Sequence, residues 1–407
     1  MSKIQKILAR EILDSRGIPT LEVEIYANTG ECARTAVPSG ISTGENEALE
    51  LRDGERRYFG KGVHKSIQNI EKIITPILLG KNIEDQKKID QLLIDLDGTE
   101  HKEKLGANTT LAISLSFAKL LAQCHQQKLW QYLQPQTYQL PVPLINILNG
   151  GLHANNGLEI QELMIVPFAE RFSERLQMGV EIFYALKTLL IQKGKNTAVG
   201  DEGGFAPEIR NLEEGLDWIL TAIEHAGYTA HTKIALDVAA STFFDPKNKT
   251  YHYLNKTWEG HQLAEYWEKM NKDYHFFSLE DPLSENDWTN WQYLTEKLGQ
   301  KILLVGDDLF VTQKKYLQKG IQEKTANAIL IKPNQVGTLS ETIEVIELAK
   351  KNNYTTILSH RSGETEDTTI ADLSVGLNTK YIKTGSVSRS ERVAKYNQLL
   401  RIEEEIK

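Results

Sequence analysis

The sequence predicts an α/β protein in which a smaller α+β capping domain precedes a C-terminal (β/α)8-type TIM barrel. Three observations predict it: a strand-like N-terminal stretch, helical patterns after it, and short apolar runs that recur through the rest of the chain. With 407 residues, the chain is long enough for two or three domains, or for one small domain beside a large barrel. We expect the α+β domain over residues 1–135 and the barrel over residues 136–407.

The N-terminal domain is predicted to begin with strands and to continue with helices. Residues 21–26 alternate between apolar and polar side chains, which is typical of a half-buried strand. A loop rich in small residues follows at 38–44, and helical patterns dominate from about residue 62 to 132. Prolines at positions 135, 141 and 143 then interrupt the chain and mark the domain boundary.

Beyond residue 140, short apolar runs each end in polar residues and precede a segment of helical length. From the third run on they recur at steps of about 25 to 30 residues, the length of one βα unit. Continuously apolar runs are typical of parallel strands that are covered on both faces. No Gly-x-Gly-x-x-Gly follows the first run, which favours a barrel over a dinucleotide-binding sheet. The runs are 198–202, 234–237, 276–280, 302–307, 328–332, 356–360 and 381–383.

Ionisable residues end nearly every run, and in a barrel these ends meet at one mouth. Asp237, Glu280 and Asp307 are three carboxylates that would repel one another unless a hard divalent cation neutralised them. Any one of them alone would more often cap the following helix. Because this set contains no histidine or cysteine, Mg²⁺ or Mn²⁺ is favoured over Zn²⁺.

Cationic and imidazole groups end the later runs, at Lys332, His360 and Lys383. A lone lysine in such a place usually reaches out to solvent, but here two would point into the mouth that holds the metal. Nearby metal charge lowers the pKa of a lysine, so a neutral amine could act as general base. Arg361 and Ser362 suit a phosphate or carboxylate, and we therefore expect a small polyanionic substrate.

Two further acidic segments, around Glu162 and Glu202, complete the predicted chemistry. A carboxyl group among other carboxylates can have a raised pKa and serve as a general acid. A metal, a lysine base and a carboxylic acid together indicate proton abstraction beside a carboxylate, with loss of a leaving group on the opposite side.

Composition excludes several other classes. The formal net charge is −8 and basic residues form only scattered doublets, so dedicated binding to nucleic acid or to a membrane is not expected. The charged N-terminus lacks the apolar stretch of a signal peptide, and the most hydrophobic window is too short and polar for a membrane span. Cys32 and Cys124 are expected as two buried thiols, although one disulfide is possible. A cytoplasmic protein is predicted.

Many motifs resemble those of the enolase family, and the resemblance runs from about residue 3 to 405, almost the whole chain. Several of them are long and rarely found elsewhere. They include ILDSRG, VPSGISTGENEALELRDG, NGGLHANN, NTAVGDEGGFAP, SLEDPLSENDW, VGDDLFVT, ILIKPNQVGTL, LSHRSGETED and IKTGSVSRSERVAKYNQLLRIEEE.

The resemblance implies the reversible dehydration of 2-phosphoglycerate to phosphoenolpyruvate, a step of glycolysis and gluconeogenesis, in the enolase variant of the barrel. Lys332 would take the α-proton, and Glu202, assisted by Glu162, would protonate the departing hydroxyl. A Mg²⁺-stabilised ene-diolate would form between these steps. A lysine base with Mg²⁺ ions is the established pattern of enolase-superfamily sites. The chemistry predicted from the residues and that implied by the resemblance are therefore not independent.

The resemblance also implies the ligand sets. Two Mg²⁺ ions would bind: one on Asp237, Glu280 and Asp307, and a second that arrives with substrate and takes Ser42. Arg361 and Ser362 would hold the phosphate, Lys383 the carboxylate end, and His153 would close over the site. The catalytic residues would be Glu202, Lys332, Glu162 and His360, and the substrate-binding residues His153, Gln161, Glu162, Lys332, Ser359, His360, Arg361, Ser362 and Lys383.

The family is typically dimeric, and assemblies of dimers also occur. Ion pairs between subunits would join Arg10 to Glu391 and Glu22 to Arg401. Two alternatives stay open: a divergent homologue in phosphonate metabolism, and a binding or structural role such as contact with plasminogen or the RNA-degradation machinery. The chain departs from the family pattern at Ile18, Ile41 and Leu163, none of which is an expected catalytic or metal residue.

Overall fold

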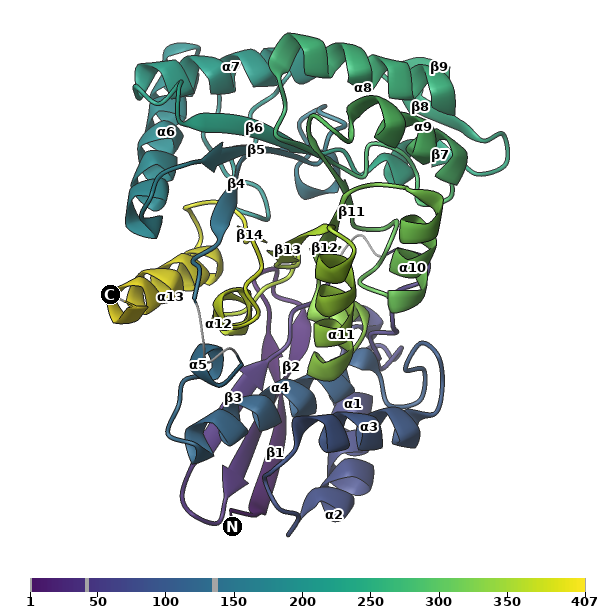
Figure 1. Ribbon diagram of the computed structural model, residues 1–407, viewed down its shortest axis with the longest axis vertical. Helices are drawn as coiled ribbons and strands as arrows, with labels where there is room; N and C mark the ends of the chain where they lie inside the picture. The colour runs from purple at the N-terminus through teal and green to yellow at the C-terminus, as the bar shows by residue number, and fades with distance from the viewer. Residues whose placement is uncertain (1, 41–43, 134–137, 407) are drawn as a thin grey trace.

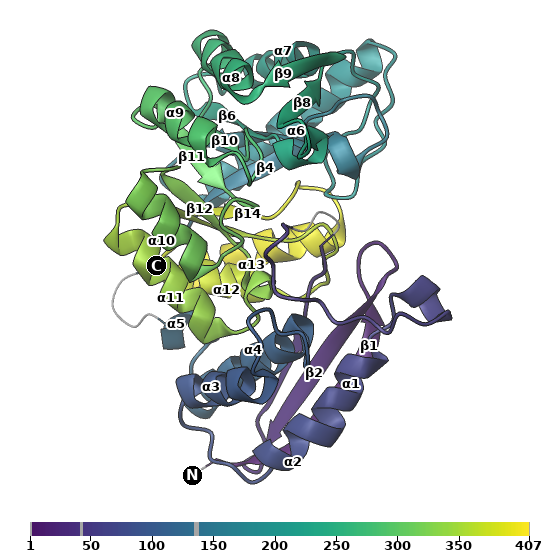
Figure 2. The same ribbon diagram turned by 90° about the vertical axis from the view of Figure 1, so that its right-hand side faces the viewer.

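The computed structural model describes residues 2–40, 44–133 and 138–406 (Figure 1). The N-terminal domain lies at one end of the long axis, and the barrel occupies the rest (Figures 1 and 2). The antiparallel sheet of the N-terminal domain has the strand order β1-β2-β3, which confirms the predicted strand over residues 21–26. The strands are β1 (Ile4–Leu13), β2 (Pro19–Ala27) and β3 (Cys32–Ala36).

Helices follow the sheet, as the sequence predicts. The central one is α4 (Ala107–Cys124), which is buried along almost its whole length because it packs on β2 and β3 and also contacts the barrel helix α11 (Leu339–Lys351). Asp85 caps α3 by accepting hydrogen bonds from two backbone amides of its first turn. The others are η1 (Arg57–Gly60), α1 (His64–Asn69), the π-helix η2 (Ile70–Ile74), α2 (Thr75–Leu78), α3 (Gln86–Asp97) and α5 (Leu129–Leu133).

Eight strands form a closed barrel with the order β10-β11-β12-β13-β14-β4-β5-β6, which confirms the predicted fold class. All neighbouring strands are parallel except β5, which runs antiparallel to both β4 and β6. The strands are β4 (Val142–Asn149), β5 (Glu162–Pro167), β6 (Thr232–Asp237), β10 (Ser278–Glu280), β11 (Leu303–Gly306), β12 (Ala328–Ile331), β13 (Thr355–Ser359) and β14 (Tyr381–Lys383).

The prediction of a first barrel strand at residues 198–202 is wrong. The run at 198–202 lies in the connection between α6 (Phe172–Gln192) and α7 (Leu212–His225), where Val199 forms only an isolated bridge with Phe205. Gly203 turns the chain there with φ +87°, and a Cβ at this position would lie 2.5 Å from the carbonyl oxygen of Ser388. None of the predicted runs covers β4 or β5. The antiparallel direction of β5 has no sequence signal, because an apolar strand shows the same pattern in either direction.

Helices cover the outside of the barrel, and a small antiparallel sheet with the order β7-β8-β9 precedes α8. The remaining helices are η3 (Gly151–His153), η4 (Ala240–Phe243), α8 (Gly260–Tyr274), α9 (Trp288–Leu298), α10 (Lys314–Glu323), η5 (Pro333–Gln335), α11 (Leu339–Lys351), α12 (Thr369–Gly376) and α13 (Ser390–Ile406). The small sheet consists of β7 (Phe244–Asp245), β8 (Thr250–Tyr253) and β9 (Lys256–Glu259).

Side chains fill the barrel interior. A buried cluster inside the barrel is separate from the larger cluster that packs the strands against the helices. This filling makes the barrel a packed core and leaves functional groups to its mouth. The interior cluster consists of Leu144, Met164, Val166, Ala235, Val305, Ala328, Leu330, Ile357 and Tyr381.

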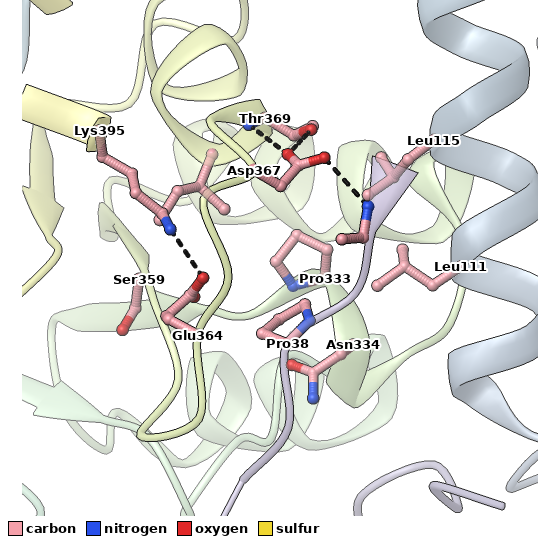
Figure 3. Close-up of a pocket in the computed structure, with 12 residues that line it drawn as sticks. Pro38, Leu111, Leu115, Pro333, Asn334, Ser359, Glu364, Asp367, Thr369 and Lys395 are labelled. Carbon is pink, nitrogen blue, oxygen red and sulfur yellow. Dashed lines mark hydrogen bonds and ion pairs between the residues drawn. The ribbon is translucent and has the colours of Figure 1, made fainter. Parts of the chain in front are cut away.

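Buried polar contacts hold the N-terminal domain against the barrel (Figure 3). Asp367 accepts hydrogen bonds from the backbone amide of Ala36 (3.1 Å) and from Lys119 Nζ (2.8 Å), so both a strand and a helix of the N-terminal domain reach it. Nearby, Lys395 forms a buried ion pair of 2.8 Å with Glu364. Apolar side chains such as Leu115 line a cavity between the two parts.

Within the described residues, no helix is long and apolar enough to cross a membrane. Cys32 and Cys124 are both free thiols. Each is half-buried rather than fully buried, because Cys32 begins the edge strand β3 and Cys124 ends α4.

Candidate active site

A polar cavity lies at the mouth of the barrel. Every residue that lines it belongs to the set predicted from the sequence. Of the other predicted residues, Glu280 and Asp307 contact lysines that line the cavity, and Ser42 lies outside the described residues, as does Ile41. The lining residues are His153, Gln161, Glu162, Glu202, Asp237, Lys332, Ser359, His360, Arg361, Ser362 and Lys383.

Strand ends place these groups together. Asp237, Glu280, Ser359 and Lys383 are the last residues of four parallel strands, so they emerge at the same end of the barrel. Glu162 reaches the same end for the opposite reason: it is the first residue of the antiparallel strand β5.

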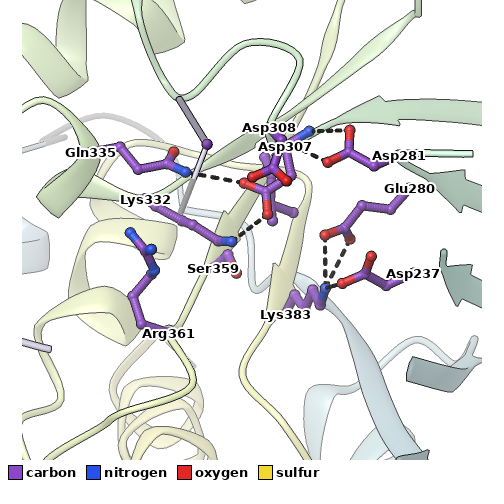
Figure 4. A network of polar contacts seen from close by, with 12 residues as sticks. Asp237, Glu280, Asp281, Asp307, Asp308, Lys332, Gln335, Ser359, Arg361 and Lys383 are labelled. Atoms are coloured by element: carbon purple, nitrogen blue, oxygen red, sulfur yellow. Dashed lines mark hydrogen bonds and ion pairs between the residues drawn. The ribbon is translucent and has the colours of Figure 1, made fainter. Parts of the chain in front are cut away.

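Lys383 lies at the centre of one group of carboxylates (Figure 4). Its Nζ donates to Asp237 Oδ2 at 2.8 Å and to Glu280 Oε1 at 2.8 Å, and it lies 2.9 Å from Glu162 Oε1. Burial opposes the charged ammonium, but the surrounding carboxylates outweigh it and raise the pKa of Lys383 well above its usual value. The one ammonium thus offsets the repulsion among three buried acids.

The same carboxylates respond differently to that ammonium. Burial raises the pKa of Glu280 well above its usual value, and the charge of Asp237 adds to the effect. Burial acts in the same direction on Asp237, but Lys383 outweighs it through its charge and hydrogen bond, and the pKa of Asp237 is lowered.

Lys332 forms a second ion pair at the mouth. It follows β12, and its Nζ donates a hydrogen bond to Asp307 Oδ2. Burial acts to lower the pKa of Lys332, but the charge of Asp307 outweighs it and the pKa is raised. In this structure Lys332 is therefore an ammonium.

Glu162 also forms an acidic pair with Glu202, and a carboxylate oxygen of each lies within 4.8 Å of the other. Burial, followed by the negative charge of Glu202, raises the pKa of Glu162 well above its usual value, which favours a proton on the Glu162 carboxyl group. Asn146 Nδ2 donates to Glu202 Oε2 at 3.1 Å. His153 Nδ1 and His360 Nε2 each lie 3.5 Å from an oxygen of Glu202.

The two histidines are neutral, and the tautomer of His360 is fixed. Burial lowers the pKa of His153, and burial together with the charge of Arg392 lowers that of His360 far below its usual value. Arg392 Nη1 lies 2.6 Å from His360 Nδ1. Because a guanidinium can only donate, Nδ1 accepts and the ring proton sits on Nε2, facing Glu202.

The predicted phosphate-binding group, Arg361, is held by residues that the sequence reading did not single out. Its Nη1 donates to Glu47 Oε2 at 2.9 Å and to Asn334 Oδ1 at 3.1 Å, and its Nη2 donates to Glu47 Oε1 at 3.2 Å. Burial acts to lower the pKa of Arg361, but Glu47 outweighs it and the pKa is raised. The backbone also approaches closely: a Cβ on Gly40 would lie 2.0 Å from Nη2.

The carboxylate oxygens at the mouth fit Mg²⁺, which prefers hard oxygen ligands. Among the described residues, Asp281, Asp307 and Asp308 bring carboxylate oxygens within 4.8 Å of one another. This cluster shares only Asp307 with the predicted ligand set. Asp281 uses its two oxygens to accept the backbone amides of Asp307 (3.0 Å) and Asp308 (2.7 Å), so its role here is to hold the loop that carries Asp307.

Several site residues were missed, although their motifs contribute to the resemblance. Glu47 lies in VPSGISTGENEALELRDG, Gln335 in ILIKPNQVGTL and Arg392 in the C-terminal motif. Arg392 is fully buried and also donates to the backbone oxygens of Arg361 and Ser362, both at 2.6 Å. A fully buried arginine in an otherwise polar stretch has no sequence signal apart from the motif.

The expected dimer residues have partners within the single chain. Arg10 Nη1 lies 2.5 Å from Glu22 Oε1, since the two face each other across β1 and β2. Glu391 pairs with Arg389 at 2.7 Å, and Arg401 Nη1 donates to Gln398 Oε1 at 3.4 Å.

The fold and the site together define an α/β-barrel protein whose mouth combines buried carboxylates with lysines. Residues 4–133 match the family model described as enolase, N-terminal domain. Residues 137–407 match the model described as enolase, C-terminal TIM barrel domain. The chain belongs to the enolase family, which indicates a lyase-type enzyme.

Proposed function

We propose that this protein interconverts 2-phosphoglycerate and phosphoenolpyruvate by removing and adding water. The observation that carries the proposal is that Lys332, Glu202 and Arg361 line one buried cavity, so a base, an acid and a phosphate-binding group can reach a single small molecule.

Lys332 is the proposed base. Its neutral amine takes the proton from the carbon that bears the phosphate, and that carbon's bonding electrons form the new double bond. The bond between the neighbouring carbon and its hydroxyl then breaks, and the electron pair leaves with the oxygen. Glu202 gives this oxygen a proton, so that water departs, and Glu162, whose raised pKa favours a bound proton, is proposed to assist it.

Two cationic arms hold the substrate's ends. Arg361 and Ser362 are proposed to bind the phosphate and Lys383 the carboxylate end, while Gln161 and Ser359 line the space between them. His153 is proposed to close over the substrate, and the proton on His360 Nε2 to fix the carboxyl group of Glu202.

Asp237, Glu280 and Asp307 would hold one Mg²⁺, and Ser42 would contribute to a second. When bound, Mg²⁺ would neutralise the carboxylates that now hold the lysines protonated and would stabilise the charge developing on the substrate carboxylate.

The assay is the rise in ultraviolet absorbance as 2-phosphoglycerate becomes phosphoenolpyruvate, with Mg²⁺ and then with excess chelator. Turnover that stops with chelator is the expected result. A folded, Mg²⁺-binding protein without turnover would reject the proposed substrate and favour the phosphonate-metabolism homologue.

We further propose that two copies form a dimer through Arg10 with Glu391 and Glu22 with Arg401. The supporting observation is that the Arg10 side chain is 40 % exposed although it pairs with Glu22 and Glu24, so a carboxylate of a second subunit can reach it. Light scattering of the wild type and of Arg401→Glu distinguishes this dimer from a monomer.

A further inference from the structure

One side chain with no assigned role joins the group around Arg361 to the group around Asp307 and Lys332. Gln335 is fully buried at the end of η5, between Asp307 and Glu47. Its Nε2 donates to Asp307 Oδ1 at 3.2 Å and to Glu47 Oε1 at 3.1 Å. Figure 4 shows this amide directed toward Asp307, with Lys332 on the other oxygen of that carboxylate.

The chemistry of the partners fixes the orientation of this amide. Carboxylates only accept hydrogen bonds, so the NH₂ group must face Glu47 and Asp307, and one hydrogen is available for each. The opposite side of the amide confirms the assignment: Thr312 Oγ1 donates to Gln335 Oε1 at 2.6 Å. That hydroxyl in turn accepts the backbone amide of Lys332 at 2.9 Å.

The backbone that presents the Thr312 hydroxyl is strained. Val311 and Thr312 have φ values of +43° and +54°, and both are β-branched residues that rarely adopt the left-handed region. Such strain persists where surrounding structure enforces it, and it concentrates at functional sites. Here the strained backbone places the Thr312 hydroxyl between the backbone amide of Lys332 and the side-chain amide of Gln335.

We propose that Gln335 is a positioning residue that couples the phosphate arm, Arg361 with Glu47, to the metal and base arm, Asp307 with Lys332. Glu47 binds the guanidinium end-on, so displacement of Arg361 moves Glu47. Through the shared NH₂ group, that movement reorients Asp307. The roles of the two arms rest on the proposed function, whereas the coupling between them rests on the hydrogen bonds.

The test is a double-mutant cycle on Mg²⁺ binding, measured by titration calorimetry with the metal alone. Gln335→Met keeps the length and removes both hydrogens, and we expect its Kd for Mg²⁺ to rise about 10- to 100-fold, as for other residues that orient metal ligands. Glu47→Gln, which touches no proposed metal ligand, should also weaken Mg²⁺ binding. In the Gln335→Met background, Glu47→Gln should have no further effect.

Several results would overturn the coupling. A direct electrostatic effect of the Glu47 charge on Mg²⁺ would persist without Gln335. If the free-energy effects of Gln335→Met and Glu47→Gln on Mg²⁺ binding are additive, the coupling through Gln335 is therefore rejected. Wild-type Mg²⁺ affinity in Gln335→Met would reject it as well, as would a wild-type chain that binds no Mg²⁺. A coupled cycle in a protein that fails to turn over 2-phosphoglycerate would keep the coupling and reject only the substrate.

Two further variants control for folding. Gln313→Met is the matched control, because among the described residues Gln313 Nε2 donates only to the backbone oxygen of Gln335, and its Mg²⁺ affinity should equal the wild type's. If thermal unfolding shows that Gln335→Met does not fold, Thr312→Val replaces it. That variant removes the hydroxyl that orients the amide and should shift the Mg²⁺ Kd in the same direction by a smaller factor.

Discussion

Glu162 and Asp237 are direct partners across the antiparallel strands β5 and β6, and Lys383 Nζ lies within 2.9 Å of both carboxylates. Two acids that face each other on neighbouring strands would repel in the low-dielectric interior. The ammonium from β14 offsets that repulsion, and Glu280 is the third acid on it.

Replacing Lys383 with methionine should destabilise the fold. The change leaves buried carboxylates without their shared cation, and breaking a buried ion pair in this way costs about 3–5 kcal/mol. Thermal unfolding should show a lower Tm, and Mg²⁺ should restore part of the loss because it can take the place of the ammonium charge. Lys395→Met is the control: its ion pair with Glu364 lies away from the metal ligands, so Mg²⁺ should restore nothing there. An unchanged Tm for Lys383→Met would contradict the central role of this lysine.

Replacing Lys332 with alanine should abolish exchange of the substrate α-proton with solvent while leaving substrate binding measurable. Loss of a general base typically costs a factor of about 10²–10⁴ in rate. Exchange is followed by NMR of 2-phosphoglycerate in heavy water. The surface variant Lys314→Ala, whose side chain is 53 % exposed and pairs with Glu344, should exchange at the wild-type rate. Retained exchange in Lys332→Ala would mean that another group is the base.

Replacing Glu202 with glutamine should separate the two chemical steps. Dehydration needs the acid and should stop, whereas proton removal by Lys332 does not need it and some exchange should remain. The same NMR experiment, combined with the absorbance assay, measures both. If both steps disappear together, the division between base and acid is wrong.

Asp372 and Asp367 should respond to pH with opposite signs. Burial raises the pKa of Asp372 from 3.8 to about 6. The folded state therefore binds the proton more tightly, and stability falls as pH rises from about 4 to about 6. Asp372→Asn should remove this penalty and stabilise the protein at pH 7.5 by about 2–3 kcal/mol, with little gain at pH 4.

Asp367 provides the matched comparison. Burial acts to raise its pKa, but Lys119 outweighs it and the pKa is lowered. Its contribution to stability is therefore present above its unfolded pKa and is lost as pH falls through the lowered one. Asp367→Asn should lower the Tm at pH 7.5. Equal Tm changes of the same sign in both variants would contradict the two electrostatic environments.

The sequence alone predicted the fold class, which the closed barrel confirms, and it predicted that ionisable groups meet at the mouth of that barrel. Apolar runs at a regular spacing indicate βα units, and their ionisable last residues predict which groups meet. Asp237, Lys332, His360 and Lys383, which end such runs, line the cavity, whereas His153, Gln161 and Ser359 were named only through the family resemblance. Periodicity is enough to predict this meeting of groups, because the C-terminal ends of all parallel strands in a barrel lie at the same mouth.

Only the tertiary structure decided the direction of β5, the turn at 198–202, and the partners of each charged group. An apolar strand reads the same in either direction, so the sequence could not show that Glu162 begins its strand and yet reaches the mouth. Gln335 and Glu47 lie 288 residues apart, and the hydrogen bond between them exists only when the N-terminal domain packs against the barrel. Long-range pairing of polar groups depends on three-dimensional distance and burial, neither of which local sequence patterns encode.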